Sequence, residues 1–279
     1  MPKRRANMQF FALPGDVPET ITLGGASYRR QGVFKHDFFA ATCLYRTKSN
    51  APFEQIVVKF GRTQPFCGIP CDWYAEAMLK HEQAIYRTLT GTEGVPRWAG
   101  TLSRTAYAIE YIDAKPLDHL DSPPPGFFDR LAEIFRQIHQ RGVGYGDANK
   151  RSNILADSDG NPWLVDFQIS LRLREDWPTP LRQVNRTAVR YFQRADIYHL
   201  YKHKRRLARH ELRPEEEQLS RRRGLLHTLH RKLTDPWRRL RRKFLKQQHR
   251  KGALRSPTGH LEEHHQPEKA TWRDEVDAK

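Results

Sequence analysis

Hydrophobic residues in the first half of the chain alternate between strand-like runs and one helical repeat. Apolar, β-branched and aromatic residues fill 38–45 and 55–60, which predicts two strands joined by the turn-rich TKSNAP. From 71 to 90 the apolar positions follow helical spacing, and the glycines of GTEG end this predicted helix. Residues 106–112 (AYAIEYI) predict a further strand.

The second half of the chain is predicted to be mainly helical. The segment DSPPPG introduces a helix over 127–141, in which Leu131, Ile134, Phe135 and Ile138 lie on one face. Two short apolar runs, 154–155 and 163–165, flank the turn DSDGNP and predict a hairpin. After residue 170 the chain reads as helical and basic. This order indicates the α+β class, with a small sheet-rich lobe followed by a mostly helical lobe.

The same pattern suggests the boundaries of these parts. We expect residues 1–18 to form a flexible N-terminal segment and residues 19–113 to form the β-rich lobe. The helical lobe is expected over 114–251 and contains basic amphipathic helices at 215–251. The polar tail, 252–279, is expected to be disordered.

Composition excludes several classes of protein. The 279 residues are 38% hydrophobic and 29% charged, which fits a globular protein, and no run approaches 18 apolar residues. Three cysteines do not make a disulfide framework, so we expect a reducing cytoplasm. Two of them, in CGIPC (67–71), are interpreted as reduced thiols and not as a zinc site, because no Cys/His quartet accompanies them.

The formal net charge of +17 is concentrated in about fifty residues. Residues 201–251 contain 19 Lys/Arg and 5 Asp/Glu, a net charge of +14, whereas residues 1–200 have a net charge of only +5. Apolar residues recur at helical intervals from 219 to 245 among the arginines and lysines. Packing on the helical lobe, binding to an anionic membrane surface and binding to nucleic acid all remain open, in that order of preference.

Four side chains carry the candidate chemistry. Asp147 follows a helix and a glycine-rich turn, in YGDANKRSNIL. Asn153 comes six residues later at the start of a strand, and Asp166 ends the next strand, in WLVDFQIS. A hairpin places Asn153 and Asp166 side by side, and their oxygens are hard ligands suited to Mg²⁺ that carries phosphates. Asp147 is placed to accept a hydroxyl proton, and Lys150 to neutralise charge on a transferred phosphoryl group.

This layout resembles the protein-kinase-like superfamily, with its catalytic loop followed by a metal-binding Asp-Phe-Gly segment. Here Tyr145-Gly146-Asp147 and Asp166-Phe167-Gln168 stand at those two places. The resemblance implies a two-lobed kinase-like fold and use of ATP and Mg²⁺. It makes Asp147 and Lys150 catalytic, and Asn153 and Asp166 the metal ligands.

The same resemblance supplies candidate nucleotide-binding residues upstream. Lys59, in VVK, is similar to the strand lysine that holds the α- and β-phosphates, and Glu82 is similar to the helix glutamate that pairs with it, with Glu76 as a competitor. The best candidate phosphate cover is GVFKHDFF, which begins at Gly32, and Glu110 lies on the strand that leads to the adenine hinge. In the helical lobe, Asp196 is similar to the buried aspartate that braces the catalytic loop.

The sequence departs from the usual kinase pattern, and these departures indicate which branch of the superfamily it resembles. The interval from Asp147 to Asn153 is six residues where five is usual, Gln168 replaces a flexible glycine, and the glycine-rich loop is degenerate. Only 30 residues separate Asp166 from Asp196, without an Ala-Pro-Glu motif. These features resemble the atypical bacterial branch, including lipopolysaccharide core sugar kinases, RIO-type kinases and bacterial Ser/Thr kinase-like proteins.

The sequence therefore predicts a cytoplasmic phosphotransferase that moves the γ-phosphate of ATP to a hydroxyl group. The acceptor is a lipopolysaccharide-type sugar or a protein Ser/Thr, and the basic segment makes peripheral attachment to the inner face of a membrane an additional expectation. Two alternatives stay open, together with a weaker third, a kinase of soluble small molecules such as aminoglycosides. One is a pseudokinase that binds nucleotide as a scaffold, and the other is a RIO-like kinase associated with nucleic acid.

Overall fold

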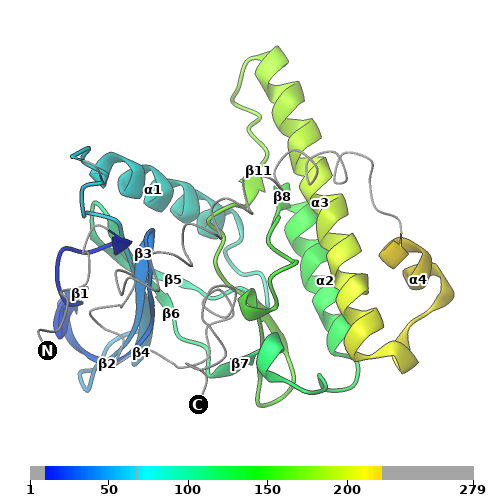
Figure 1. The fold of residues 1–279 in the computed structure, drawn as a ribbon, viewed down its shortest axis with the longest axis horizontal. Coiled ribbons are helices and arrows are strands. Elements are labelled where there is room, and N and C mark those ends of the chain that lie inside the picture. Colours follow the sequence, from blue (N-terminus) through cyan, green and yellow to red (C-terminus); the bar gives the residue numbers. More distant parts are fainter. Residues whose placement is uncertain (1–9, 67, 222–279) are drawn as a thin grey trace, which may run out of the picture. The chain divides into compact units, whose positions relative to one another are not determined.

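A computed structural model describes residues 10–66 and 68–221 of the chain (Figure 1). Within this part the chain forms two compact units. The first contains the residues up to 80 together with 99–111, and the second contains 81–98 and 112–221. The first is rich in β-structure and the second is mainly helical, so the predicted α+β class is confirmed.

The first unit is built on a six-stranded sheet. Its strand order is β1-β2-β3-β4-β6-β5. The pairs β1–β2, β2–β3, β3–β4 and β4–β6 are antiparallel. The strands are β1 (Thr20–Leu23), β2 (Ala26–His36), β3 (Ala40–Arg46), β4 (Gln55–Gly61), β5 (Trp98–Ser103) and β6 (Ala106–Glu110). Helix α1 (Asp72–Thr88) begins in this unit and ends in the second. Gly61 lets the helix approach the sheet, because a Cβ there would come within 2.8 Å of the Ala75 side chain.

The core of the first unit lies along the strands and includes Tyr28, Val33, Cys43, Tyr45, Ile56, Val58 and Ala108. Residues 10–18 contribute buried side chains to this unit, although the whole segment 1–18 is predicted to be flexible. Phe11, Ala12 and Val17 are all buried, and the carbonyl oxygen of Ala12 accepts hydrogen bonds from two backbone N–H groups at 63 and 64. Burial of these apolar side chains holds the segment in place.

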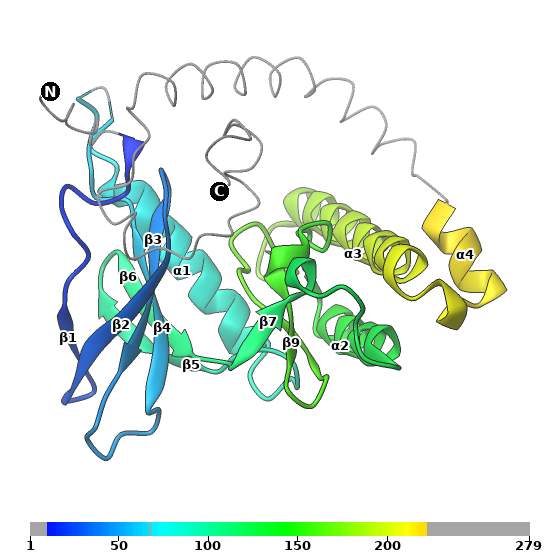
Figure 2. The ribbon, with the colours of Figure 1, turned by 60° about the horizontal axis from the view of Figure 1, so that its bottom comes forward.

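The second unit contains α2 (Phe127–Gln140), α3 (Thr179–Leu207) and α4 (Pro214–Arg221), and α2 and α3 lie side by side (Figures 1 and 2). Its short strands form two small sheets, β10-β9-β7 and β11-β8. They are β7 (Ala114–Pro116), β8 (Val143–Gly144), β9 (Ile154–Asp157), β10 (Pro162–Leu164) and β11 (Leu171–Arg172). Three short 3-10 helices occupy Leu117–His119, Arg151–Asn153 and Arg209–Glu211.

Helix α2 buries the stripe that its sequence predicts: Leu131, Ile134, Phe135 and Ile138 are all buried. The predicted hairpin is also present, as β9 and β10 pair antiparallel around DSDGNP.

The strands over 20–36 were not expected. In β2, charged positions interrupt the alternation of polar and apolar residues, and two irregularities shift its pairing with β3. Such shifts break the two-residue period by which a strand is recognised.

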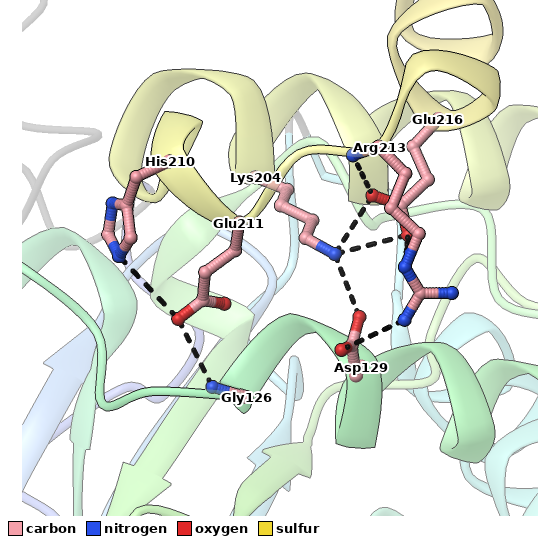
Figure 3. A network of polar contacts seen from close by, with 7 residues as sticks. All are labelled: Gly126, Asp129, Lys204, His210, Glu211, Arg213 and Glu216. Atoms are coloured by element: carbon pink, nitrogen blue, oxygen red, sulfur yellow. Dashed lines mark hydrogen bonds and ion pairs between the residues drawn. The ribbon is translucent and has the colours of Figure 1, made fainter.

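Within the second unit, Lys204 connects α4 to α2 and α3 through ion pairs (Figure 3). The fully buried ammonium of Lys204 on α3 lies 2.8 Å from Asp129 Oδ1 on α2 and 2.9 Å from Glu216 Oε2 on α4. Glu216 also accepts a hydrogen bond from the backbone N–H of Arg213, just before α4. Of the basic helices expected at 215–251, only the residues to 221 are described, and the rest lies outside the described residues together with the tail.

Candidate active site

The loop Tyr145-Gly146-Asp147 is anchored by Asp196 on α3. The Asp196 carboxylate is fully buried and accepts hydrogen bonds from the backbone N–H groups of Tyr145 at 2.9 Å and Gly146 at 2.8 Å. His139 on α2 approaches the same carboxylate with Nε2 at 3.0 Å. Burial raises the pKa of Asp196, while His139 and the two backbone donors act in the opposite direction. The bracing contact expected of Asp196 is therefore present.

Two further residues of α3 hold the loop after Asp147. His203 Nε2 lies 2.9 Å from the carbonyl oxygen of Ala148, and Lys202 Nζ donates to Asn149 Oδ1 at 2.9 Å. Burial lowers the pKa of His203 to about 4, so its ring is neutral near pH 7 and Nε2 carries the hydrogen that the carbonyl accepts. The spacing of Asp196 and His203, two helical turns apart on one helix face, was the signal that sequence reasoning missed.

The structure brings Asn153 against Asp147. The side-chain amide of Asn153 donates to Asp147 Oδ2 at 2.8 Å. Two turns shorten the path between them, since the N–H of Lys150 bonds to the carbonyl of Asp147 and the N–H of Asn153 bonds to the carbonyl of Lys150. The unusual six-residue interval therefore still produces a direct contact.

Asp166 and Asn153 lie at the same end of the β9–β10 hairpin. Ile154 is opposite Leu164, and beyond this pair the N–H of Val165 donates to the carbonyl of Asn153 at 3.1 Å. Asp166 follows directly. Its φ of 62° is in the left-handed region, which an aspartate tolerates better than most residues but still at a cost in free energy.

Phe167 fixes the turn that starts at Asp166. Its ring is fully buried and lies edge-on to the rings of Tyr86 and Tyr145, with centroids 5.2 Å away in both cases. The Tyr145 ring in turn contacts Phe135 of α2 at 6.1 Å. These ring contacts connect α1, the turn, the loop and α2.

The donors at this end of the hairpin fit a magnesium ion. The side-chain nitrogen of Asn153 donates to Asp147, so its side-chain oxygen, Oδ1, is the atom that remains as a ligand. Asp166 adds a carboxylate. Mg²⁺ prefers such hard oxygens and commonly takes one or two protein ligands together with phosphate and water. Residues 10–66 and 68–221 contain no group of three or more His, Cys, Asp or Glu arranged as a metal site.

The nucleotide-binding candidates of the first unit lie on its sheet. Lys59 is in β4, opposite Thr42 of β3, and Glu110 is the last residue of β6. Gly32 lies inside β2 beside a register shift, and the turn within GVFKHDFF comes after the end of β2, so the role of this segment as phosphate cover stays a prediction. The turn that follows is tight, because Asp37 Oδ1 accepts the N–H groups of Phe39 and Ala40.

The two candidate glutamates on α1 have different surroundings. Glu76 forms ion pairs with Lys80 at 2.7 Å and Arg104 at 2.6 Å, and hydrogen bonds from these two residues lower the pKa of its carboxyl. Glu82 is almost completely buried, with 1% of its surface exposed. Because Lys59 and Glu82 belong to different compact units, their predicted pairing stays a prediction. The same is true of the role of the Lys150 side chain.

A comparison with models of known protein families gave no match, and none was found among curated proteins. Among solved structures, the chain is similar to the Rio2 kinase from Chaetomium thermophilum, at 16% identity and a TM-score of 0.49 over 68% of this chain and 61% of that one. It is also similar to the ADP/Mg²⁺-phosphoaspartate complex of the Rio2 kinase from Chaetomium thermophilum, at 18% identity and a TM-score of 0.47 over 66% and 57%. The chain thus spans less than two thirds of the length of these two structures.

Neither of these two structures is a lipopolysaccharide core sugar kinase, and no family model or curated protein supports that branch. In the part of the chain that the structure describes, no helix has the length and apolarity needed to cross a membrane.

Proposed function

We propose that this protein is an ATP-dependent phosphotransferase of the protein-kinase-like type, which transfers the γ-phosphate to a hydroxyl group. The observation that carries the proposal is the contact of Asn153 with Asp147 at 2.8 Å, with Asp166 next to Asn153 at the end of the hairpin. The side chains that we assign as proton acceptor and metal ligands thus occupy one small region.

Asp147 serves as the base in this proposal. Its carboxylate takes up the proton of the acceptor hydroxyl while the new bond between oxygen and γ-phosphorus forms and the bond to ADP breaks. The amide of Asn153 and the loop anchored by Asp196 keep the carboxylate in one orientation. Positioning of this kind is the main contribution that a protein makes to phosphoryl transfer.

Lys150 neutralises charge that develops on the transferred phosphoryl group. Lys59, for which Glu82 is the predicted partner, is assigned to the phosphates that are not transferred, and Gly32 and Glu110 are assigned to the nucleotide site. Asn153 and Asp166 would hold Mg²⁺, which would neutralise phosphate charge.

The test is turnover of radiolabelled ATP with Mg²⁺ by the full chain and by Asp147→Ala, alongside ADP binding followed by thermal shift. Separate reactions contain generic protein acceptors and a bacterial envelope lipid extract. We expect Asp147→Ala to lose phosphotransfer and to retain ADP binding. A matched control is Asp159→Ala, which removes a carboxylate from the exposed tip of the β9–β10 hairpin and should leave turnover unchanged.

The outcomes separate the alternatives. Label in proteins or in glycolipid identifies the acceptor class. Binding of ADP without transfer to any acceptor favours the pseudokinase scaffold, and no binding at all contradicts the proposal. For the RIO-like alternative, the discriminating result is salt-dependent RNA binding that is lost when residues 222–251 are removed. Binding of the same basic segment to anionic vesicles tests the membrane expectation.

A further inference from the structure

Two tyrosines pack on Phe167 in nearly the same way. Tyr86, on α1, and Tyr145, on the loop before Asp147, each lie with ring centroids 5.2 Å from Phe167. The interplanar angles are 70° and 72°, and both tyrosines are buried. As ring contacts, the two side chains are therefore equivalent.

Their hydroxyl groups are not equivalent. The Tyr145 O–H donates to the carbonyl of Val165 at 2.5 Å. The Tyr86 hydroxyl is buried and has no hydrogen-bond partner among the described residues. A buried hydroxyl without a partner costs free energy, and a phenylalanine would pack on Phe167 without that cost. The hydroxyl of Tyr86 therefore needs an explanation other than packing.

Two carboxylates raise the pKa of the Tyr86 hydroxyl. Glu82 lies one helical turn before Tyr86 on α1, and Asp166 directly precedes the phenylalanine that Tyr86 contacts. Burial raises the pKa of Tyr86 most strongly, and the charges of Glu82 and Asp166 raise it further. Glu82 is on the same helix, and the hydroxyl does not bond to it. Asp166 is the carboxylate that the proposed function assigns to Mg²⁺, so a donor beside it has a role in metal binding.

We propose that Tyr86 is a positioning residue for the metal site: its hydroxyl donates a hydrogen bond to the Asp166 carboxylate when that carboxylate binds Mg²⁺. This inference rests on the proposed function. Carboxylates that bind metals are commonly held by a second hydrogen bond, which orients the ligating oxygen. Asp166 has a left-handed backbone, and Gln168 stands two residues later where a glycine would leave the turn freer. The turn therefore offers little adjustment of the carboxylate, and a side-chain donor is a way to set its orientation.

Tyr86→Phe tests the proposal, because it keeps the ring and removes only the hydroxyl. The measurement is the affinity for ADP by titration calorimetry, with Mg²⁺ and with EDTA, together with Tm. We expect the Tm of Tyr86→Phe to be unchanged or higher, and its affinity for ADP in EDTA to be unchanged. The gain in ADP affinity that Mg²⁺ provides should fall about 10-fold, the size of effect seen when outer-shell partners of metal ligands are removed.

Tyr145→Phe is the matched control. It removes the same atom from the other side of Phe167, where the hydroxyl has a structural partner, so we expect Tm to fall by about 2–4 °C. If Tyr86→Phe behaves in this way, losing Tm with no change in the effect of Mg²⁺, the hydroxyl is structural and the proposal is wrong.

A double-mutant cycle with Asp166→Asn keeps the test specific. In that background Tyr86→Phe should have no further effect on the Mg²⁺-dependent gain, and an undiminished effect would show that Tyr86 does not act through Asp166. If the unmodified chain binds ADP with Mg²⁺ and Tyr86→Phe binds it equally well, only this inference fails. If the unmodified chain shows no Mg²⁺-dependent ADP binding, the proposed function fails as well.

Discussion

The amide of Asn153 donates to Oδ2 of Asp147 at 2.8 Å, although six residues separate the two along the chain. The contact joins the candidate base to a candidate metal ligand, so a change at one is expected to alter the other. Two backbone turns between them and the buried position of Asn153 keep the pair together.

Exchange of the donor in this pair should abolish phosphotransfer. Asn153→Asp keeps the size of the side chain but places a second carboxylate against Asp147, and like charges at this distance repel. We expect the initial rate to fall by at least about 100-fold, the lower end of what a positioned base contributes. The measurement is transfer of radiolabelled phosphate. A rate within about threefold of the unmodified chain would contradict the role given to this hydrogen bond.

Removal of the Asp196 carboxylate should destabilise the second unit. Asp196→Ala leaves the buried backbone N–H of Tyr145 and the partly buried N–H of Gly146 without this partner, and loss of a buried partner costs about 1–3 kcal/mol. We expect the free energy of unfolding to fall by about 3 kcal/mol, measured by urea denaturation. The exposed control Asp159→Ala should stay within about 0.5 kcal/mol. Equal stability of the two variants would show that Asp196 does not support the loop.

Two glycines should respond differently to the same substitution. Gly146 has a φ of 79°, and a Cβ there would come within 2.8 Å of the Phe192 ring, so Gly146→Ala should cost more than about 2 kcal/mol and displace Asp147. Around Gly32 nothing lies within 4 Å of an added Cβ. Gly32→Ala should therefore leave Tm unchanged, and any loss of ADP affinity in this variant reports a direct role in nucleotide binding.

The buried ion pair of Lys204 should matter much more than an exposed pair (Figure 3). Lys204→Met removes the cation from two carboxylates, one of which is buried, and loss of one partner from a buried pair costs about 3–5 kcal/mol. Arg136→Met, which breaks the exposed pair with Glu133, should leave the free energy of unfolding almost unchanged, because solvent screens such a pair. Urea denaturation of both variants measures the difference. Similar values would show that α4 is not held by this contact.

Stability should fall in mild acid because of His203. Burial lowers its folded-state pKa to about 4 from an ordinary value of 6.5, so between these pH values the unfolded chain binds more protons than the folded one. The contribution of His203 to stability is therefore complete above about pH 6.5 and is lost as the pH falls toward 4, by up to roughly 3 kcal/mol. Unfolding by urea at several pH values measures this.

The matched variant for this pH effect is His203→Gln, whose amide can still donate to the carbonyl of Ala148. Its stability should depend less on pH between about 6.5 and 4 than that of the unmodified chain. If the two profiles run parallel over this range, His203 is not the group responsible.

The sequence by itself determined the parts of this protein that depend on neighbouring residues. The apolar stripe over 127–141 predicts α2, the turn DSDGNP predicts the hairpin, and the residue types at 147, 153 and 166 indicate the candidate chemistry. Such features follow from periods of two or 3.6 residues and from turn chemistry, so they can be read without the rest of the fold.

Only the tertiary structure decided which distant side chains support that chemistry. Asp196 and His203 act on a loop about fifty residues earlier, and Tyr86 meets Phe167 from a helix eighty residues away. No local period encodes these contacts, because they join side chains of α1 and α3 to the loops on either side of the hairpin. The charged, irregular strand β2 was missed for a related reason: its pairing with β3, and not its own alternation, makes it a strand.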